Sequence, residues 1–548
     1  MHTTILRATL LAAATLCLIA TAARAAVTLP SLFTNRMVLQ RDQPIKIWGK
    51  AAPGEKVTIT FADKTATATA GSSGHWLATL PPMPASAGPR SLKITSSEIP
   101  NPESEISNLK SENTTTTTIT NVLVGDVWLA SGQSNMFFQL RQTVNAQETI
   151  AASANPNIRY FDVPRTVADE PQFTSKSHWV DCTPKTSGRF SAVAFHFAQQ
   201  LQRDLDIPVA IIHASWGGTN AEAWTPRDIL AASPVTASII TKWDATMRDF
   251  PKIKADFEAS KDRLDAEWKL ACEKAAAEGR MPPAAPRLRT GPGTQYQPAG
   301  LYNAMIAPLA PYAIRGVIWY QGEGNAPRPV QYRTLFPAMI NSWRALWDRP
   351  ALPFLFVQLP NLARQPEPSK SGWAEIREAQ LRALALPHTA MAVTIDVGDP
   401  KNLHPANKLP VGQRLAYAAE ALCGQRLPAA AICPYPAKYH IKGNEIRVTL
   451  TPAGVTLKTS DNAAPRGLVI AAADKKFVPA RTRIEGNTLV IWSDEIKSPA
   501  AARHAWADNP DCNLVSTAGL PVSPFRTDGW PTPASENEAA AAAFPPNN

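Results

Sequence analysis

The sequence predicts an α/β protein with a three-layer core, in which helices cover both faces of a parallel sheet, and with two flanking β-rich modules. Between residues 121 and 428, continuous apolar runs alternate with helical stretches. Strands that are apolar throughout are typical of a parallel sheet buried on both faces. Residues 26–120 and 429–530 instead contain short strands separated by turn residues, which favours β-sandwich-like modules. The length of 548 residues also exceeds the span of one core.

Each expected strand of the central sheet is a short apolar run, and several of these runs lead into polar, glycine-containing segments. The runs occupy residues 122–124, 127–129, 209–212, 317–320, 354–357 and 391–395. Helical stretches are expected at residues 193–205, 373–386 and 409–422. Ligand sites in such sheets collect at the carboxyl ends of the strands, so we expect the functional residues there.

One stretch of the central segment, residues about 230–290, interrupts this alternation. Residues 252–280 are rich in Ala, Lys and Glu, which predicts an exposed helical insertion. Two interpretations stay open: a lid or wall of the substrate cleft, and a peripheral helical pair without function.

The two ends of the chain are predicted to lie outside the folded modules. Residues 1–25 read as a signal peptide, with Arg7, an apolar stretch and the small-x-small pattern at 23–25. A membrane anchor is the alternative, but the stretch is short for a spanning helix. We therefore expect an exported protein, periplasmic or secreted. Residues 531–548 are mostly Pro, Ala, Glu and Asn, which predicts a disordered tail.

The charges and cysteines exclude some classes of function. The formal net charge is +10, but the charges are scattered, so we expect no nucleic-acid partner and, after signal cleavage, no membrane partner. No cluster of Cys and His predicts a metal site, and we expect no cofactor. Cys423 and Cys433 are close enough in sequence to pair, or they are two buried apolar residues. The oligomeric state is not predicted.

A serine lies at the end of the first central strand. In the segment Gly132-Gln133-Ser134-Asn135-Met136, the serine falls at a strand-to-helix turn, where helix N-terminal amides face any developing negative charge. This segment is not the Gly-x-Ser-x-Gly elbow of the α/β-hydrolases. Taken alone, Ser134 is better explained as an N-cap.

Three further segments follow later strands. In residues 213–220, paired glycines follow a strand, and Ser215 is a rival nucleophile that we rank below Ser134. In residues 319–325, Asn325 is either an amide donor or a turn residue. In residues 396–408, His404 lies in a loop near carboxylates, which is typical of a general base.

Together, these four segments resemble those of the SGNH hydrolases and specifically of the sialate O-acetylesterase family. The family patterns Gly-Gln-Ser-Asn-Met, Ser-Trp-Gly-Gly-Thr, Trp-Tyr-Gln-Gly-Glu-x-Asn and Gly-Asp-x-x-x-x-His-Pro-x-Asn-Lys occur here in order. Residues 32–40, 373–380 and 524–527 also resemble that family, so the similarity covers nearly all of the mature chain. It implies an SGNH-hydrolase, flavodoxin-like core.

The resemblance also implies residue roles. Ser134 corresponds to the nucleophile and His404 to the base. Gly217 or Gly218 corresponds to the backbone donor of the oxyanion hole and Asn325 to its side-chain donor. The usual SGNH acid lies three residues before the histidine, where this chain has Lys401. We expect Asp399 to orient His404 instead, with the alternatives Asp396, Asn402 and a backbone carbonyl. Residues considered for substrate binding are Gln133, Trp216 and Glu323.

The function implied by the resemblance is removal of O-acetyl groups from a carbohydrate, with sialate favoured as the substrate and plant hemicellulose such as xyloglucan as the alternative. A non-catalytic carbohydrate-binding protein and a lipase-like hydrolase are two further readings. Tryptophans at 216, 224 and 319 favour a sugar ligand, because aromatic faces pack on sugar rings, although the same residues suit a core.

Overall fold

A computed structural model describes residues 27–97, 114–278, 282–283, 285–288, 290–363, 371–424 and 431–543. The predicted signal peptide, residues 1–25, lies outside the described residues. The chain divides into two compact units. The smaller unit comprises Met1–Pro30, Lys46–Leu80 and Ser91–Ile119, and the larger one comprises the rest of the chain.

The smaller unit consists of β-strands, of which β2 and β5 form a separate two-stranded sheet. Strand β2 pairs with β5, and β3 pairs in antiparallel fashion with β4 and β6. Apolar side chains alternate along these strands, and Trp76, Ala78 and Leu80 of β5 are all buried. The strands are β2 (Ile45–Lys50), β3 (Lys56–Phe61), β4 (Lys64–Thr69), β5 (His75–Leu80) and β6 (Ser86–Ser97).

The larger unit is a mixed α/β structure around a mostly parallel sheet, which confirms the predicted class at that level. The strand order is β13-β12-β11-β7-β10-β8-β9, and only β9 is antiparallel to its neighbour. A short strand, β1, runs parallel to β7. The bounds are β1 (Val38–Gln40), β7 (Thr114–Gly132), β8 (Asn155–Asp162), β9 (Trp179–Cys182), β10 (Val209–Ser215), β11 (Gly316–Tyr320), β12 (Phe354–Val357) and β13 (Thr389–Ala392).

One detail of this sheet differs from the expectation. The runs at 122–124 and 127–129 belong to one long strand, β7, because Gly125 allows a close approach rather than a turn: a Cβ there would lie 2.0 Å from the Pro208 carbonyl oxygen. The strands β10-β7-β11-β12-β13 follow the order 2-1-3-4-5 of a flavodoxin-like sheet, and β8 and β9 extend the sheet beyond β10.

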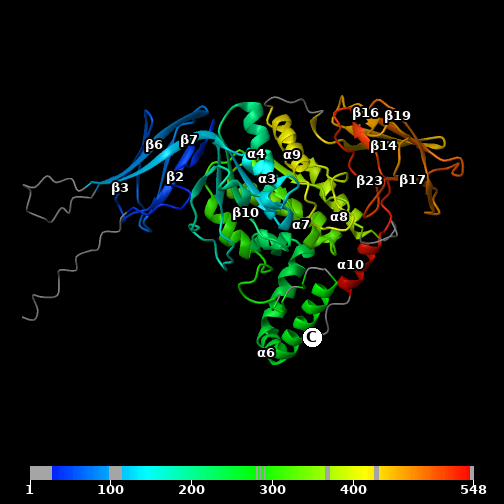
Figure 1. Cartoon of the computed structure of the whole chain (residues 1–548), viewed down its shortest axis with the longest axis horizontal. Helices are drawn as coiled ribbons and strands as arrows, with labels where there is room; N and C mark the ends of the chain where they lie inside the picture. The colour runs from blue at the N-terminus through cyan, green and yellow to red at the C-terminus, as the bar shows by residue number, and fades with distance from the viewer. Residues whose placement is uncertain are drawn as a thin grey trace, which may run out of the picture. The chain divides into compact units, whose positions relative to one another are not determined.

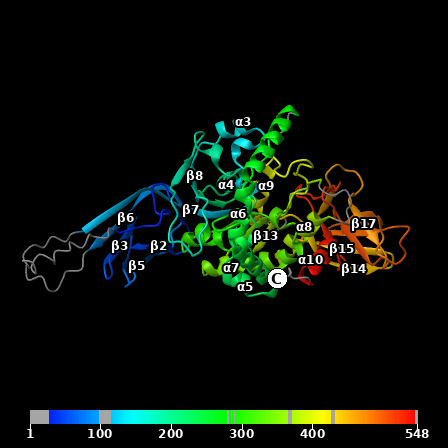
Figure 2. The ribbon, with the colours of Figure 1, turned by 90° about the horizontal axis from the view of Figure 1, so that it is seen from below.

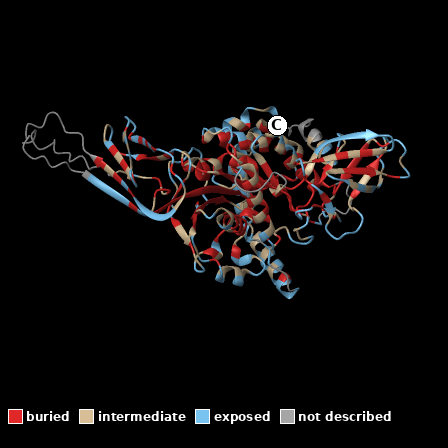
Figure 3. Cartoon of the chain, turned by 90° about the horizontal axis from the view of Figure 1, so that it is seen from above, coloured by how far each residue is buried: buried red, intermediate tan, exposed pale blue. Residues whose placement is uncertain are grey.

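Helices cover both faces of the sheet, and the strand register shows which face each one covers. Trp128 of β7 packs edge-on against Phe197 of α4 (Ala192–Leu205). Trp128 pairs with Gly316 in β11, so Trp319, three residues further on, points to the opposite face. There it stacks on Phe336 of α7 (Pro329–Leu346). Helix α9 (Leu409–Leu422) lies beside α4, and α8 (Gly372–Arg382) lies beside α7 (Figure 1). The sheet between them is buried (Figure 3).

The predicted insertion is one long helix, α6 (Pro234–Ala277), that extends away from the sheet (Figures 1 and 2). Only Thr236, Ile239 and Ala275 of its 44 residues are buried. None of the described helices combines the length and apolarity needed to cross a bilayer. Three short helices complete this region: α2 (Ser134–Phe137), α3 (Ala146–Ala151) and α5 (Arg227–Ala231).

The carboxy-terminal module contains two four-stranded sheets, β14-β15-β20-β19 and β18-β17-β21-β23, and a third pair, β16-β22. Side chains from both four-stranded sheets share one apolar core, which includes Ile446, Ile470 and Ile491. The Gly-Asn turns occur where predicted, with Gly443 and Gly486 at φ +61° and +63°. The bounds are β14 (Tyr435–Lys442), β15 (Glu445–Thr451), β16 (Leu457–Thr459), β17 (Leu468–Ala471), β18 (Phe477–Pro479), β19 (Arg481–Glu485), β20 (Thr488–Trp492), β21 (Ala501–His504), β22 (Leu514–Ser516) and β23 (Phe525–Arg526).

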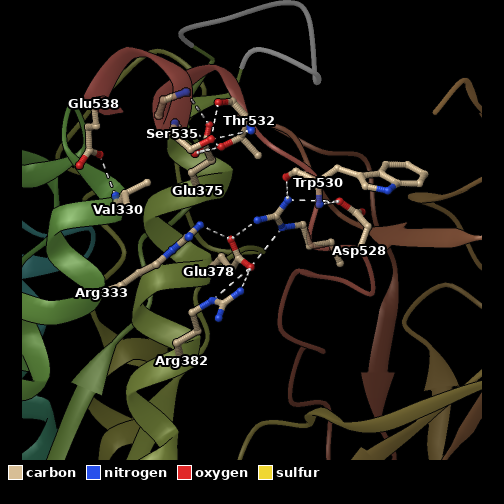
Figure 4. Close-up of polar contacts among 12 residues, drawn as sticks. Val330, Arg333, Glu375, Glu378, Arg382, Asp528, Trp530, Thr532, Ser535 and Glu538 are labelled. Atoms are coloured by element: carbon tan, nitrogen blue, oxygen red, sulfur yellow. Dashed lines mark hydrogen bonds and ion pairs between the residues drawn. The ribbon is translucent and has the colours of Figure 1, made fainter. Parts of the chain in front are cut away.

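The predicted disordered tail is wrong for most of its length, because residues Pro533–Ala543 form helix α10. Glu538 of this helix accepts hydrogen bonds from the backbone amides of Val330 and Gln331, both at 2.8 Å (Figure 4). These amides belong to the first turn of α7, which has no intrahelical partner for them. The composition of the tail predicted disorder, because composition does not show that Glu538 contacts the first turn of α7.

The five cysteines after the predicted signal peptide are all free in the structure. Cys433 is buried, and Cys423 is partly buried. The buried-residue interpretation of Cys433 is therefore confirmed, and the pairing alternative is not.

Candidate active site

Ser134 begins helix α2 directly beyond the carboxyl end of β7, the central strand of the parallel sheet. The backbone there passes between the ends of β10 and β11: Gln133 N–H donates to the Tyr320 carbonyl, and Trp216 N–H donates to the Gly132 carbonyl. Gly132 has φ +137°, and a Cβ would lie 2.1 Å from the Tyr320 carbonyl oxygen. The close approach that only glycine permits therefore places the serine at the centre of the sheet edge.

His404 approaches Ser134 from the loop between β13 and α9. The distance from His404 Nε2 to Ser134 Oγ is 2.8 Å, within hydrogen-bond reach for proton transfer. The ring lies beside Phe138, with 6.5 Å between the ring centroids, and the His404 backbone N–H donates to Asn402 Oδ1. These contacts hold the imidazole against the hydroxyl.

Asn135, the residue after the serine, ties the serine to the histidine loop. Its side chain is fully buried and donates to the Leu403 carbonyl at 3.1 Å and to Glu323 Oε1 at 2.5 Å. Its Oδ1 accepts from Lys408 Nζ at 2.5 Å. One amide thus links α2, the end of β11 and the start of α9, and it fixes the separation of Ser134 and His404.

Burial shifts the titration of the groups around this pair. Burial lowers the pKa of Lys408 to about 7, against the opposing effect of Glu323. Burial, and then the positive charge of Lys408, lowers the pKa of His404 below its ordinary value. Burial raises the pKa of Glu323. A lowered histidine pKa keeps the imidazole neutral, which is the form that accepts a proton from serine.

Three backbone amides around Ser134 are available to a ligand. Those of Ser134, Gly217 and Gly218 donate no hydrogen bond to any residue that the structure describes. Gly217 packs directly on the serine, since a Cβ there would lie 3.3 Å from Ser134 Cβ. Gly218 has φ +73° and is exposed. Backbone amides that are free to donate beside a nucleophile are the groups that form an oxyanion hole.

Asn325 does not lie where the sequence placed it. Its side chain is fully buried, Oδ1 accepts from the Ala221 backbone amide, and Nδ2 donates to Glu222 at 2.9 Å. Glu222 is held in turn by Arg328. Asn325 therefore supports the loop that follows β10, and the prediction that it donates to an oxyanion needs correction.

Two of the residues considered for substrate binding are likewise part of the framework. Gln133 is buried, and its Oε1 accepts from the Gly324 amide at 3.1 Å. Glu323 is buried against Asn135. Trp216 is partly exposed and remains open to a ligand, whereas Trp224 and Trp319 are fully buried core residues.

The structure does not bring Asp399 to His404. Asp399 Oδ1 accepts from the Lys401 backbone amide, which closes a tight turn of the loop. Asp396 is occupied by Arg414 through two bonds of 2.6 Å, and the Asn402 side chain accepts from the His404 backbone amide rather than from its ring. Within the described ranges, no carboxylate or backbone carbonyl accepts from His404 Nδ1. The prediction that Asp399 orients the base is corrected, and a serine–histidine pair remains.

The comparisons with known proteins agree with these features. The family model "Carbohydrate esterase, sialic acid-specific acetylesterase" matches residues 291–421. Sialate O-acetylesterases of Rattus norvegicus and Homo sapiens are each 28% identical over 90% of the chain, covering 93% and 91% of their own length. A carbohydrate acetylesterase of Xanthomonas citri superposes with a TM-score of 0.74 at 34% identity, over 92% of this chain and 100% of its own.

The chain belongs to the sialate O-acetylesterase family of carbohydrate esterases. The resemblance of its four motifs to that family is therefore confirmed, and the family's members are named as ester hydrolases.

A second serine of this esterase has a more complete set of partners than Ser134. Ser215 Oγ lies 2.6 Å from His213 Nε2, and His213 Nδ1 lies 2.7 Å from Asp162 Oδ1. Ser215 and His213 are each only 3% exposed, however, so no ester can reach the hydroxyl without local opening. Partly exposed Ser134, with free amides beside it, is the better nucleophile.

Sequence reasoning missed several residues of the esterase site. His213 and Ser215 are two apart on one strand, so their side chains share a face, and this spacing was a usable signal. Asn135 and Lys408 lie inside the family patterns Gly-Gln-Ser-Asn-Met and His-Pro-x-Asn-Lys, but these patterns do not show what the two side chains contact. Asp162, the partner of His213, and Gln295, which donates to the Gly217 carbonyl, carry no local signal because their partners are distant in sequence. Among the residues that the structure describes, no three His, Cys, Asp or Glu side chains are grouped to hold a metal ion.

Proposed function

We propose that this chain is a carbohydrate O-acetylesterase that works through Ser134 and His404, on an SGNH-type core. The observation that carries the proposal is the 2.8 Å contact between Ser134 Oγ and His404 Nε2, beside the unpaired amides of Gly217 and Gly218. A non-catalytic protein would not need this arrangement, and a lipase-like hydrolase does not fit the family membership.

In the proposed reaction, His404 Nε2 takes the proton of Ser134 as Oγ attacks the acetyl carbonyl carbon. The carbonyl oxygen becomes an oxyanion, which accepts hydrogen bonds from the backbone amides of Ser134, Gly217 and Gly218. The bond to the sugar oxygen breaks, and His404 returns the proton to that oxygen. Water then attacks the acetyl-serine by the same route, releasing acetate and restoring Ser134.

The first test compares acetate release from 4-nitrophenyl acetate by the wild type, Ser134→Ala and the matched control Ser215→Ala. We expect Ser134→Ala to lose at least about 10³-fold in kcat, since the nucleophile is gone. Ser215→Ala should keep most of its activity, because its hydroxyl is buried. Equal turnover by wild type and Ser134→Ala, or loss confined to Ser215→Ala, would refute the assignment.

The favoured substrate is an O-acetylated sialate, with a neutral hemicellulose such as xyloglucan as the alternative. Arg165 supports the anionic sugar. Its guanidinium carbon lies 4.5 Å from the centroid of the Phe137 ring, and Phe137 ends the helix that Ser134 begins. Arg165 is exposed, and no described carboxylate pairs with it. A cation so held is available to the carboxylate of a sialate.

This choice is tested with Arg165→Gln and, as a distant control, Arg248→Gln on the exposed helix α6. On 9-O-acetylated sialic acid, Arg165→Gln should raise KM about tenfold or more, since a charge-assisted hydrogen bond contributes about 1.5–3 kcal/mol. Its rate on 4-nitrophenyl acetate should not change. Wild-type activity on acetylated xyloglucan but not on the sialate would select the neutral substrate.

We also propose that the protein is exported and that both flanking modules are β-sandwich-like. The shared core of the two carboxy-terminal sheets and the alternation in β5 support the second point. Export is tested by the amino-terminal residue of the mature protein: Ala26 is expected, and a retained Met1 would contradict it.

A further inference from the structure

The loop that carries the free Gly217 and Gly218 amides accepts a hydrogen bond from the side chain of Gln295. Gln295 Nε2 donates a hydrogen bond of 2.8 Å to the Gly217 carbonyl oxygen. Because that oxygen can only accept, the amide nitrogen of Gln295 must face it, which settles the orientation of the side chain.

The carbonyl that Gln295 holds belongs to the same peptide group as the Gly218 amide. A trans peptide is planar, with its C=O and N–H pointing in opposite directions, so fixing the carbonyl also fixes the direction of the N–H. The peptide lies between two glycines, and Gly218 is at φ +73°, so the backbone itself restrains it little. The Gly217 carbonyl has no other hydrogen-bond donor among the described residues.

Gln295 is itself delivered by an anchored segment rather than a free loop. The Gly293 amide donates to Gln297 Oε1 at 3.0 Å, and Gln297 Nε2 donates to Asp169 Oδ1 at 2.6 Å. The Ala299 amide donates to the Glu222 carbonyl at 3.0 Å. The residues just after Gln295 are thus fixed to the loops after β8 and β10, and Gly293, just before it, is bonded to Gln297 of the same segment.

We propose that Gln295 is a positioning residue that aims the Gly218 N–H at the reacting oxygen. The bond also polarises the peptide, because a carbonyl that accepts a hydrogen bond strengthens the donor at the other end of the same group. The inference rests on the proposed function, since it concerns the oxyanion hole of the same reaction.

The test compares Gln295→Leu, which removes the donor, and Gln295→Glu, which keeps the shape but presents only acceptors, with the neighbouring control Tyr296→Phe. The Tyr296 hydroxyl is hydrogen-bonded to none of the described residues. The substrate is 4-nitrophenyl acetate, which is too small to reach sugar contacts. Binding of phenylboronic acid, which forms a tetrahedral adduct with an active serine, is measured on the same proteins.

A misdirected Gly218 N–H should lower kcat less than the removal of a donor, which typically lowers kcat about 10²–10³-fold. We therefore expect both Gln295 variants to lose about 10- to 100-fold in kcat and in kcat/KM alike, with unchanged KM and Tm and with boronate affinity reduced by a similar factor. Tyr296→Phe should match the wild type in every measurement.

Wild-type kcat and boronate affinity in Gln295→Leu, while Ser134→Ala is inactive, would overturn the Gln295 assignment and leave the proposed function intact. A raised KM with normal kcat would overturn it as well, because it would make Gln295 a substrate contact. A folded wild type without esterase activity would overturn both.

Discussion

At the scale of single residues, the distinctive feature is a serine and a histidine that no described carboxylate orients, next to a buried lysine. In the Ser–His–Asp arrangement, the carboxylate holds the imidazole and stabilises its charge. Here Asn135 and Phe138 position the two reacting groups instead, and Lys408 opposes the charge on His404. The site therefore favours neutral histidine at the start of the reaction.

This electrostatic arrangement predicts the pH dependence. His404 is active as a base when neutral, and both burial and Lys408 lower its pKa, so the acid limb of kcat/KM should have its midpoint below 6.5. Lys408, with a pKa of about 7, is mostly charged below that pH. Lys408→Met removes the positive charge, favours the imidazolium and should move the midpoint upward. A wild-type midpoint above 6.5, or a downward shift in a folded Lys408→Met variant, would contradict this account.

At the scale of elements, a buried carboxylate of α8, that of Glu378, contacts the carboxy-terminal module. Glu378 accepts from Arg333 at 2.8 Å, from Arg382 at 2.9 Å and from Arg526 of β23 at 3.1 Å (Figure 4). Burial raises the pKa of Glu378, but Arg526 and the other two guanidinium groups lower it more, so the net shift is downward. The interaction joins three elements that are far apart in sequence.

Removing this carboxylate should destabilise the protein strongly. Glu378→Gln leaves Arg526 buried with one fewer counter-charge, and breaking such a pair costs about 3–5 kcal/mol. Arg382→Ala, whose side chain is 53% exposed, should cost no more than about 1 kcal/mol. Urea unfolding at pH 7 measures both.

The pH dependence of the same interaction gives a second readout. The pKa of Glu378 is lowered on folding, so its contribution is present above the ordinary glutamate value of 4.5 and is lost as pH falls through the folded value. The difference between wild type and Glu378→Gln should shrink in acid. Equal stability of the two proteins at pH 7 would contradict the role given to this contact.

At the scale of the whole molecule, the sequence predicted what is local and missed what depends on contacts between distant segments. The buried strands, the Gly-Asn turns and the serine beyond β7 follow from patterns within a few residues. The added edge strands β8 and β9 beyond β10 were not predicted, because strand pairing is a tertiary property. The tail was misjudged because Glu538 finds its partners at α7.

Within the site, too, local features were predicted and contacts between distant segments were missed. Ser134 and His404 meet as predicted, although they are 270 residues apart, because each motif lies at the carboxyl end of a parallel strand. The roles of Asn325 and Asp399 were wrong because residue type and spacing do not show which hydrogen bonds a side chain has already made. Gln295 and Asp162 could be found only from the fold.

The most direct test of the central claim is to map the residue labelled by a fluorophosphonate, which reacts only with an activated serine. The labelled protein is digested, and the modified peptide is identified by mass spectrometry. The account predicts one adduct, on Ser134, that is absent from His404→Ala because the base is missing. An adduct on Ser215, or no adduct on the folded wild type, would contradict it.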